Sequence, residues 1–530
     1  MTKIDQFYDL IVIGGGATGA GVALDAASRG LKTLLVEKND FASGTSSRST
    51  KLLHGGVRYL EAAIKHFDKE QYHLVKDGLK ERFILIKNAP HLCHKISLLT
   101  PLYKWYELPY VYAGLSIYDL LSKDKSLGRS RIISKKNAIK NFPKLKKEGL
   151  KGCVLYFDGQ FNDMRMNISI LKTAQQFGAQ VKNYTELKSF IKKNNKIIGV
   201  VLFDKIQNFE IEVGCNAVVN ATGPFTDFIR KLDDPSCEEI MEVSSGIHIA
   251  LDKSFASENT GLLIPKTDDG RVLFVLPWED ACIIGTTDEP AQVTEYPQPK
   301  EKEIEYLLKH INRYFDMQVS KNDIKSVWAG LRPLVKHSKT NSTASIVRDH
   351  YIEISPSGLI TITGGKWTTF RKMAEDTVNK LFSHFNFNGT KKCITENITY
   401  YGSNGYNQEF IDYFNKICKL DNDIKKHLLN SYGVLAKDIY EYALKNNLTD
   451  RLISNKPIIL AEVYYSIHNE FAKYPLDFLV RRTALAETDL ESAKSALDKV
   501  CDIFAEVFGW DLEKKSDIKN NSLKILNTAI

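Results

Sequence analysis

The 530-residue sequence lacks the features that mark disulfide-rich, metal-knuckle and low-complexity proteins. No two of its eight cysteines lie within four residues of each other, which excludes a Cys-x-x-Cys motif and favours free thiols in a reducing compartment. Its 32 glycines and 15 prolines are too few for a fibrous chain, and its 43% of hydrophobic residues can build large cores. At about 100–200 residues per domain, the length predicts roughly three domains.

Long hydrophobic runs and a strong excess of one charge are also missing. The longest uncharged stretch, residues 10–24, has fifteen residues and is rich in glycine. A membrane-spanning helix needs about 20 apolar residues, so we expect none. Lys and Arg number 72 against 64 Asp and Glu, a net charge of +8. That excess is too weak to imply nucleic-acid binding, but it is compatible with an anionic substrate or an anionic lipid surface.

The chain starts with the pattern of a βαβ unit. Residues 8–14 are β-branched and apolar and predict a buried strand, and residues 22–28 are rich in alanine and predict a helix that Gly30 ends. Residues 32–37 predict a second buried strand. This order of elements is typical of a nucleotide-binding parallel sheet.

The turn between the first strand and the helix carries a dinucleotide fingerprint, Gly14-x-Gly16-x-x-Gly19. The first glycine makes the tight turn, Gly16 lets the backbone approach a pyrophosphate, and Gly19 lets the helix pack on the strand. Glu37, at the end of the second strand, is placed to accept hydrogen bonds from a ribose diol. The pattern predicts a dinucleotide site and leaves FAD and NAD open.

The rest of the chain changes from strands to helices. We expect a buried strand at 217–223, antiparallel strands at 246–251, 271–276 and 281–285, a hairpin of 344–355 with 359–363, and a helix at 368–382. The polar stretch 385–405 is the predicted linker, residues from 408 onward are predicted to be helical, most clearly at 489–508, and residues 514–530 are expected to be loose.

Residues 98–122 are rich in aromatic side chains, and residues 123–151 are rich in lysine. Interfacial aromatic rings and a basic segment would suit an anionic lipid surface. An aromatic segment packed in the core and followed by a solvated basic helix is the alternative, and the sequence leaves both open.

Seven separated blocks resemble, in order, blocks of the FAD-dependent glycerol-3-phosphate dehydrogenases. The blocks are 45–60 (TSSRSTKLLHGGVRYL), 221–227 (ATGPFTD, with Phe225 where Trp is usual), 285–288 (GTTD), 330–334 (GLRPL), 348–350 (RDH), 364–369 (GGKWTT) and 477–483 (DFLVRRT). The resemblance runs from about residue 5 to residue 510. Agreement of several distant motifs makes it specific.

The resemblance implies a mixed α/β fold with three parts. These are a Rossmann-like FAD-binding domain (1–75, 150–235 and 325–384), an antiparallel-sheet substrate domain (76–149 and 236–324) and an all-α C-terminal domain (385–530). The implied reaction is the oxidation of sn-glycerol 3-phosphate to dihydroxyacetone phosphate by hydride transfer from C2 to flavin N5, with the electrons passed to a membrane quinone.

Other readings of the same family likeness stay open. An oxidase that uses oxygen and produces hydrogen peroxide, an FAD-dependent 2-hydroxy acid dehydrogenase and a flavin-binding protein without turnover are the alternatives. The resemblance also implies a cytoplasmic protein in peripheral contact with the inner face of the cell membrane, with a homodimer as a further option. We expect no nucleic-acid partner, because the basic residues lack interleaved aromatics on a known nucleic-acid module.

The resemblance assigns the candidate site residues. For FAD they are Gly14, Gly16, Ala17, Thr18, Gly19, Glu37, Lys38, Thr45, Ser46, Ser47, Ser49, Lys51, Leu53, His54, Gly55, Gly56, Ala221, Thr222, Gly223, Asp227, Thr287, Arg332, Gly365, Lys366, Trp367 and Thr368. For the substrate they are His54, Arg58, Tyr59, Arg332 and Arg348, and for catalysis His248, Arg332 and Lys366. No metal ligands are predicted.

Chemistry gives these residues their roles. Arginines bind a phosphate monoester through charged, bidentate donors. Lys366 and the helix that follows it can place positive charge beside the edge of a reduced flavin, although an ordinary turn capped by Thr368 would have the same local sequence. His248 alternates with Ile247 and Ile249 on a predicted strand, so it faces the other side of the sheet. It is the favoured general base, with Arg332 and Lys366 left open.

Overall fold

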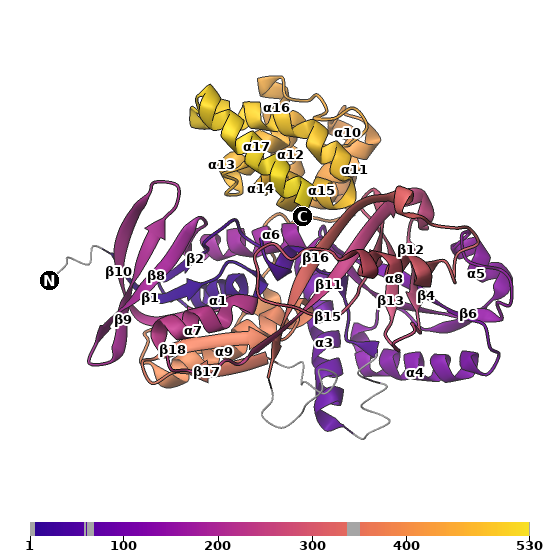
Figure 1. Cartoon of the computed structure of the whole chain (residues 1–530), viewed down its shortest axis with the longest axis horizontal. Helices are drawn as coiled ribbons and strands as arrows, with labels where there is room; N and C mark the ends of the chain where they lie inside the picture. The colour runs from indigo at the N-terminus through magenta and orange to yellow at the C-terminus, as the bar shows by residue number, and fades with distance from the viewer. Residues whose placement is uncertain (1–5, 58–59, 61–67, 337–349, 529–530) are drawn as a thin grey trace.

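The computed structural model describes residues 6–57, 60, 68–336 and 350–528. In Figure 1 they form two β-sheet lobes side by side, and the helices of the C-terminal quarter lie above them. The part of the chain from 344 to 349, predicted as half of a hairpin strand, lies outside the described residues.

The first sheet is built around the strands predicted at the start of the chain. Its order is β17-β18-β10-β1-β2-β7, with β9 antiparallel to β10 and β8 antiparallel to β9. The strands β18, β10, β1, β2 and β7 run parallel. The bounds are β1 (Gln6–Ile13), β2 (Thr33–Val36), β7 (Gln180–Lys182), β8 (Thr185–Lys193), β9 (Lys196–Asp204), β10 (Phe209–Asn220), β17 (His350–Ile354) and β18 (Leu359–Gly364).

Both faces of this sheet are covered, which explains the continuous apolar run of β1. Leu10 and Val12 belong to a core shared with the helices α1, α6 and α9, whereas Ile11 and Ile13 belong to a core shared with β8 and β9. The helices of this lobe are α1 (Ala17–Ser28), α6 (Asp163–Gln176), α7 (Thr226–Asp233) and α9 (Phe370–His384).

Helix α1 begins five residues earlier than the sequence predicted. Gly16 is its N-cap residue, with extended backbone, and Ala17 is the first helical residue. Of the fingerprint glycines, Gly19 therefore lies inside the first turn of the helix. The alanine-rich composition predicted only the second half of the helix. The first half contains two glycines, and glycine is a poor helix former, so the sequence did not indicate a helix there.

The second sheet is mainly antiparallel and curls through ten strands. Its order is β15-β11-β14-β13-β12-β4-β6-β3, with β16 paired to β11 and β5 paired to β6. Only the β4–β12 pair is parallel among the described pairs of this sheet. The bounds are β3 (Leu52–Leu53), β4 (Cys93–Leu102), β5 (Arg131–Ser134), β6 (Gly152–Phe161), β11 (Met241–Asp252), β12 (Thr260–Ile264), β13 (Leu273–Trp278), β14 (Ala281–Gly285), β15 (Glu289–Pro290) and β16 (Ile324–Val335).

Among the described residues, the helices beside the second sheet are α3 (Lys69–Asn88), α4 (Glu107–Ser122), α5 (Lys135–Asn141) and α8 (Glu301–Ile311). The lysine-rich stretch 123–151 is therefore not one basic helix but contains a short 3-10 helix at 123–125, the strand β5 and the seven-residue helix α5. Strands β3, β6 and β16 belong to this sheet although they come from ranges expected in the FAD-binding domain. The division of the chain into three domains stays a prediction.

The C-terminal part is helical, as predicted. Its helices are α10 (Gln408–Ile417), α11 (Asn422–Tyr432), α12 (Ala436–Asn446), α13 (Leu460–Asn469), α14 (Pro475–Arg481), α15 (Leu485–Thr488), α16 (Leu490–Phe508) and α17 (Leu512–Thr528). The expectation of a loose tail was wrong, because α17 packs on α16. Ile518, Ser522 and Leu526 recur every four residues, and Ser522 and Leu526 are buried. Ile518, Ser522 and Leu526 thus share one helix face.

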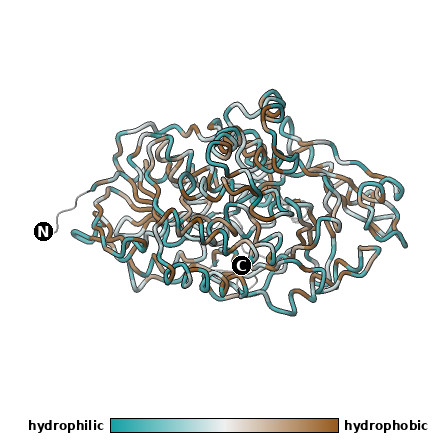
Figure 2. Tube along the Cα trace, turned by 90° about the horizontal axis from the view of Figure 1, so that it is seen from above, coloured by the Kyte–Doolittle hydropathy of each residue, from teal (hydrophilic) through white to brown (hydrophobic). Residues whose placement is uncertain are grey.

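Short 3-10 helices complete the described structure. They are η1 (Thr45–Ser47), η2 (Lys123–Lys125), η3 (Gly223–Phe225), η4 (Lys253–Phe255), η5 (Lys321–Asp323), η7 (Trp367–Thr369), η8 (Thr395–Asn397) and η9 (Gly433–Leu435). Coloured by hydropathy, the trace in Figure 2 is most hydrophilic along the outer turns, and its apolar stretches run through the interior of both lobes. Three of these short helices, η1, η3 and η7, lie at the site described below.

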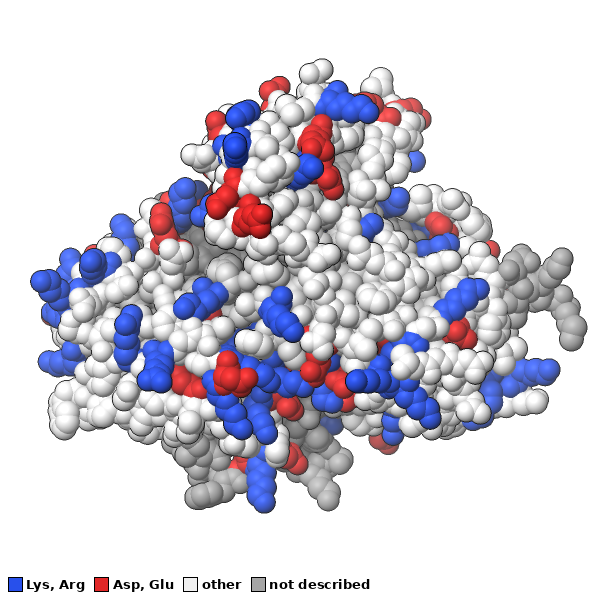
Figure 3. Space-filling view, turned by 180° about the vertical axis from the view of Figure 1, so that it is seen from behind, with Lys and Arg blue, Asp and Glu red and all other residues white. Residues whose placement is uncertain are grey.

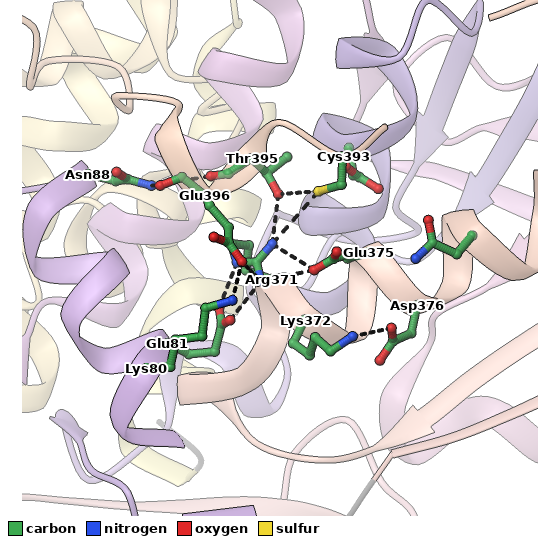
Figure 4. A network of polar contacts seen from close by, with 12 residues as sticks. Lys80, Glu81, Asn88, Arg371, Lys372, Glu375, Asp376, Cys393, Thr395 and Glu396 are labelled. Carbon is green, nitrogen blue, oxygen red and sulfur yellow. Dashed lines mark hydrogen bonds and ion pairs between the residues drawn. The ribbon is translucent and has the colours of Figure 1, made fainter. Parts of the chain in front are cut away.

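A buried arginine joins the two lobes (Figure 4). Arg371 on α9 donates from Nε and from a terminal nitrogen to the two oxygens of Glu81 on α3, both over 2.7 Å. It also bonds Glu375 and the hydroxyl of Thr395. The predicted linker is thus packed against the lobes at this point, with Thr395 and Tyr400 both 1% exposed.

Candidate active site

A cavity of about 920 Å³ opens at the carboxyl ends of β1, β2 and β10. Ligands of open parallel sheets bind at this edge, where helix N-termini and loops meet. Fourteen of the residues predicted to contact FAD line the cavity: Gly14, Gly16, Ala17, Thr18, Glu37, Lys38, Thr45, Ser46, Ala221, Thr222, Gly223, Gly365, Lys366 and Trp367. The predicted residues that do not line it are Gly19, Ser47, Ser49, Lys51, Leu53, His54, Gly55, Gly56, Asp227, Thr287, Arg332 and Thr368.

The fingerprint glycines make a backbone cradle that any side chain would fill. A Cβ atom at Gly14 would lie 2.6 Å from the carbonyl oxygen of Ala221, and Gly14 has φ of +108°. A Cβ at Gly16 would lie 2.9 Å from Ser46 Oγ, and one at Gly19 would lie 1.9 Å from the carbonyl oxygen of Gly14. This cradle at the N-terminus of α1 fits the pyrophosphate of a dinucleotide, because the phosphates need close backbone approach and a positive helix end.

Glu37 follows β2 at the cavity wall and is held in place by backbone donors. Its Oε2 accepts from the N–H of Gly15 over 2.8 Å, and its Oε1 accepts from the N–H of Asn39 over 2.9 Å. Burial raises the pKa of Glu37 above its ordinary value, and these two donors oppose the rise. Each oxygen keeps a second acceptor site, so the carboxylate can still bind the ribose hydroxyls of a cofactor.

The segment 45–54 joins three distant motifs. Ser46 Oγ accepts from the N–H of Ala17 in the fingerprint over 2.9 Å, and the carbonyl of Ser46 accepts from the indole N–H of Trp367 over 2.8 Å. The N–H of His54 donates to the hydroxyl of Thr368 over 3.3 Å. The sequence blocks that start at residues 14, 45 and 364 therefore form one continuous wall.

His248 lies on the face of the second sheet opposite Ile247 and Ile249, as the alternation predicted. Its ring stacks on Trp328 at 5.3 Å between centroids, and its Nε2 lies 3.0 Å from the hydroxyl of Thr50. Its Nδ1 is buried without a hydrogen-bond partner among the described residues. Burial first, then the positive charges of Lys51 and Arg332, lower the pKa of His248 to about 3, so the ring is uncharged at neutral pH.

Arg332 lies on the same face as His248. In the pairing of β11 with β16, Arg332 stands opposite Ser244, four residues from His248. Its guanidinium donates to Asp288 Oδ1 over 2.8 Å and to the carbonyl of Thr287 over 2.9 Å. The side chain is 28% exposed, so an anionic ligand can reach it.

Other predicted site residues have structural partners. Thr287 accepts from the N–H of Ile247 and donates to Glu303, and Asp227 accepts from the N–H groups of Ile240 and Met241. The ammonium group of Lys38 pairs with Glu295 and lies 4.3 Å from the ring centre of Phe225 at the cavity wall. Arg58, Tyr59 and Arg348 lie outside the described residues.

The helical C-terminal part supplies a wall of the cavity that the sequence did not predict. The lining includes Tyr474, Asp477 and Arg481 from the region of α14, and Ile518 and Ser522 from α17. The block 477–483 was recognised as a family motif, which was the one available signal. Nothing in a single sequence shows that this block folds back over a cavity formed by the first residues of the chain.

A buried ion-pair cluster fixes that wall to the first lobe. Asp40, 1% exposed, accepts from both terminal nitrogens of Arg482 over 2.9 Å each and from Nε of Arg481. Although burial alone would raise the pKa of Asp40, Arg482 and Arg481 hold it below its ordinary value. The stabilisation is therefore present above the ordinary carboxyl pKa of about 4 and is lost as the pH falls below it.

Replacing Asp40 with asparagine is expected to destabilise the protein by about 3–5 kcal/mol, because two buried arginines lose their shared carboxylate. The measurement is thermal unfolding of the FAD-loaded protein at neutral pH. Asp421→Asn is the matched control, because Asp421 is 74% exposed where it pairs with Arg451. Equal unfolding midpoints for the two variants would contradict a structural role for the cluster.

Comparison with known proteins matches the geometry. The family model described as "FAD dependent oxidoreductase" matches residues 9–371, and the model for the C-terminal domain of alpha-glycerophosphate oxidase matches residues 393–515. The mitochondrial glycerol-3-phosphate dehydrogenase of Rattus norvegicus is 44% identical over 527 residues, which cover 97% of this chain and 72% of the relative. The chain belongs to the FAD-dependent glycerol-3-phosphate dehydrogenase family.

Other members of this family agree over almost the whole chain. The probable mitochondrial enzyme of Dictyostelium discoideum is 43% identical, over 98% of this chain and 84% of its own length. The solved structure of the glycerol-3-phosphate dehydrogenase from Bacillus halodurans complexed with FAD has a TM-score of 0.80 and 31% identity, and it covers 99% of this chain and 95% of its own. The family membership, the mixed α/β fold with its helical C-terminal part, and FAD as the cofactor are thereby confirmed.

Proposed function

We propose that the protein oxidises sn-glycerol 3-phosphate to dihydroxyacetone phosphate with FAD and passes the electrons to a quinone. One observation carries the proposal: a cavity with a pyrophosphate cradle lies in a chain that is 44% identical to a glycerol-3-phosphate dehydrogenase. The neutral His248 and the partly exposed Arg332 share one sheet face and supply a proton acceptor and a phosphate-binding cation.

The residues of the chain have distinct tasks in this reaction. FAD, when bound, supplies the hydride acceptor. Gly14, Gly16 and Glu37 would hold its phosphates and ribose, and Lys366 with the N-terminal end of η7 and α9 would supply positive charge to its ring. Arg332 binds the substrate phosphate, and the family likeness adds Arg58 and Arg348 to that task.

His248 takes the proton of the substrate hydroxyl in this scheme. The scheme uses the tautomer in which Nε2–H donates to the hydroxyl of Thr50, so that Nδ1 carries the accepting lone pair. The stacked indole of Trp328 fixes the plane of the ring, so the accepting lone pair keeps one direction. Loss of the proton and loss of the hydride from adjacent atoms then form the ketone.

The electron acceptor has one specific competitor, molecular oxygen. The model that matches residues 393–515 describes a domain of alpha-glycerophosphate oxidase. An assay of the FAD-loaded protein with glycerol 3-phosphate, in air, with and without a soluble quinone analogue, separates the two. We expect quinone reduction with little hydrogen peroxide; stoichiometric peroxide without benefit from the quinone would assign the protein to the oxidases.

We also propose peripheral contact with a membrane surface through α4 and the residues before it. No helix in the described ranges has both the length and the hydropathy to cross a bilayer. Trp105 is 74% exposed, Tyr110 58% and Leu120 74%, while Tyr118 on the same segment is buried. Isolated exposed apolar residues are ordinary, but several large ones along one helix suit the interface of a bilayer.

The net charge of +8 adds a broad attraction to an anionic surface. On the side shown in Figure 3, Lys and Arg side chains form a band that is interrupted by acidic residues.

Replacing both Trp105 and Leu120 with serine is expected to lower the partition of the protein onto anionic vesicles about tenfold, because two exposed apolar side chains that could enter the bilayer interface are lost. Leu512→Ser, at a residue that is 85% exposed on α17, is the control. Equal partition of both variants would place the contact elsewhere. A homodimer remains a further proposal.

A further inference from the structure

A buried lysine cluster lies between the segment 45–51, whose Thr45 and Ser46 line the cavity, and the helical C-terminal part. Lys51, which is fully buried, places its ammonium 2.8 Å from Asp163 Oδ1, 2.8 Å from Glu487 Oε2 and 2.6 Å from the carbonyl oxygen of Ser47. Asp163 begins α6 and Glu487 lies on α15, so one cation joins three distant parts of the chain.

The same cluster controls the shape of the segment 47–51. Asp163 Oδ2 accepts from both the N–H and the hydroxyl of Ser49, over 3.1 and 2.6 Å. The hydroxyl of Ser49 in turn accepts from the N–H of Lys51 over 3.0 Å. Thr50, between these two residues, contacts His248. A movement of the Lys51 ammonium would therefore move the backbone of residues 50 and 51, and with it the Thr50 hydroxyl that contacts the ring of His248.

Helix α15 reaches this place because it packs on the sheet face that carries His248. The hydroxyl of Ser326 donates to the carbonyl of Ala486 over 2.7 Å, and Ser326 shares its face of β16 with Trp328 and Arg332. The ammonium of Lys51 lies 5.8 Å from the ring centre of Trp328, which also stacks on His248. Glu487 thus approaches the candidate active site from the helical side.

The cluster brings two carboxylates to one buried ammonium group. Lys51 faces two carboxylates, and Arg48 is the other cation near Glu487. Burial first, then the repulsion of Asp163, raise the pKa of Glu487 to about 7, against the opposing effect of Lys51 and Arg48. His248 is neutral in this range and adds no charge. Glu487 can therefore gain or lose a proton near neutral pH, which changes the charge that faces Lys51.

We propose that Glu487 is a positioning residue through which the helical C-terminal part fixes Lys51, the segment 45–51 and, by way of Thr50, His248. The proposal rests on the proposed function for the role of His248, and it assigns a task at the active site to a part of the chain that lies hundreds of residues from the fingerprint. Glu487 acts through Lys51 and touches neither the substrate nor the flavin in this scheme.

The test compares Glu487→Gln, which keeps the size of the side chain but not its charge, with Glu487→Asp and with Glu491→Gln, a control at an 80% exposed carboxylate on α16. The first readout needs no substrate: visible circular dichroism of bound FAD is measured against pH. We expect the wild type, Glu487→Asp and the control to show a transition, with a midpoint of about 7 in the wild type, and Glu487→Gln to show none.

The second readout is anaerobic flavin reduction by glycerol 3-phosphate at pH above the transition. We expect flavin reduction in Glu487→Gln to be about tenfold slower than in the wild type, with little change in the substrate concentration at half saturation. The variant loses the orientation of His248 but keeps the contacts that bind the substrate. A wild-type pH transition and reduction rate in Glu487→Gln would overturn the proposal. If glycerol 3-phosphate failed to reduce the flavin of the wild-type protein, the proposed function would be refuted instead. The pH dependence of the circular dichroism would still show whether Glu487 positions the segment 45–51.

A second variant covers the case in which Glu487→Gln fails to retain FAD. Thr50→Val removes the hydroxyl that contacts His248 and leaves the Lys51 cluster intact. We expect it to keep the dichroism transition and to lose about tenfold in the rate of flavin reduction. A Thr50→Val protein with the wild-type rate would overturn the proposed link from the cluster to His248.

Discussion

Replacing Gly19 with alanine is expected to give a protein that binds less than about a tenth of the wild-type FAD. The new Cβ would lie 1.9 Å from the carbonyl oxygen of Gly14, and that oxygen is backbone in the tight turn after β1. Relief requires a shift of α1 away from β1 by more than an ångström, in a part of the core where neighbouring residues are fully buried. Such a shift dismantles the phosphate cradle.

FAD content per chain, read from the absorbance of the purified protein after reconstitution, is the measurement. Gly114→Ala is the matched control, since a Cβ at this position of α4 meets no atom within 4 Å. In a helix interior that exchange stabilises by up to about 1 kcal/mol. A Gly19→Ala protein with full FAD content would show that the cradle is not where the cofactor phosphates lie.

Replacing Arg332 with alanine is expected to raise the half-saturating concentration of glycerol 3-phosphate by about a hundredfold, because a charge-assisted contact to the phosphate is lost. FAD content should change little, since Arg332 does not line the large cavity. The maximal rate should fall less than the affinity, because the arginine binds substrate and transition state alike.

Steady-state kinetics and flavin content of the same preparation test this division. Arg313→Ala serves as the control, because Arg313 forms an exposed pair with Asp268 on the second lobe. If Arg332→Ala lost FAD and substrate affinity to the same extent, the role of Arg332 would instead be structural, since it holds Asp288 and the turn 286–288 in place.

Sequence patterns over a few residues predicted the features that depend only on neighbouring residues. The fingerprint, the buried strands at the start and the alternation around His248 follow from steric and burial rules that act over a few residues, and the structure has them where expected. The first turn of α1 and the helix α17 were missed because glycine and polar residues dominate their composition, although both pack on one face.

The parts of the site that the sequence could not show are those made by contacts between distant segments. Asp40 with Arg482 spans 442 residues, and Lys51 meets Glu487 only because α15 lies on the face of β16. The sequence around each of these charged residues gives no sign of burial, because a charged residue is expected to be solvent-exposed unless its ion-pair partner is known. The family blocks named the right neighbourhoods but not the buried ion pairs that hold them together.

Anaerobic mixing of the purified protein with glycerol 3-phosphate tests most directly whether the cavity holds a flavin that the substrate reduces. We expect yellow protein with one FAD per chain, complete bleaching of the visible flavin band on mixing, and one dihydroxyacetone phosphate formed for each flavin reduced. Protein that stays colourless after reconstitution, or a bound flavin that glycerol 3-phosphate leaves oxidised, would contradict it.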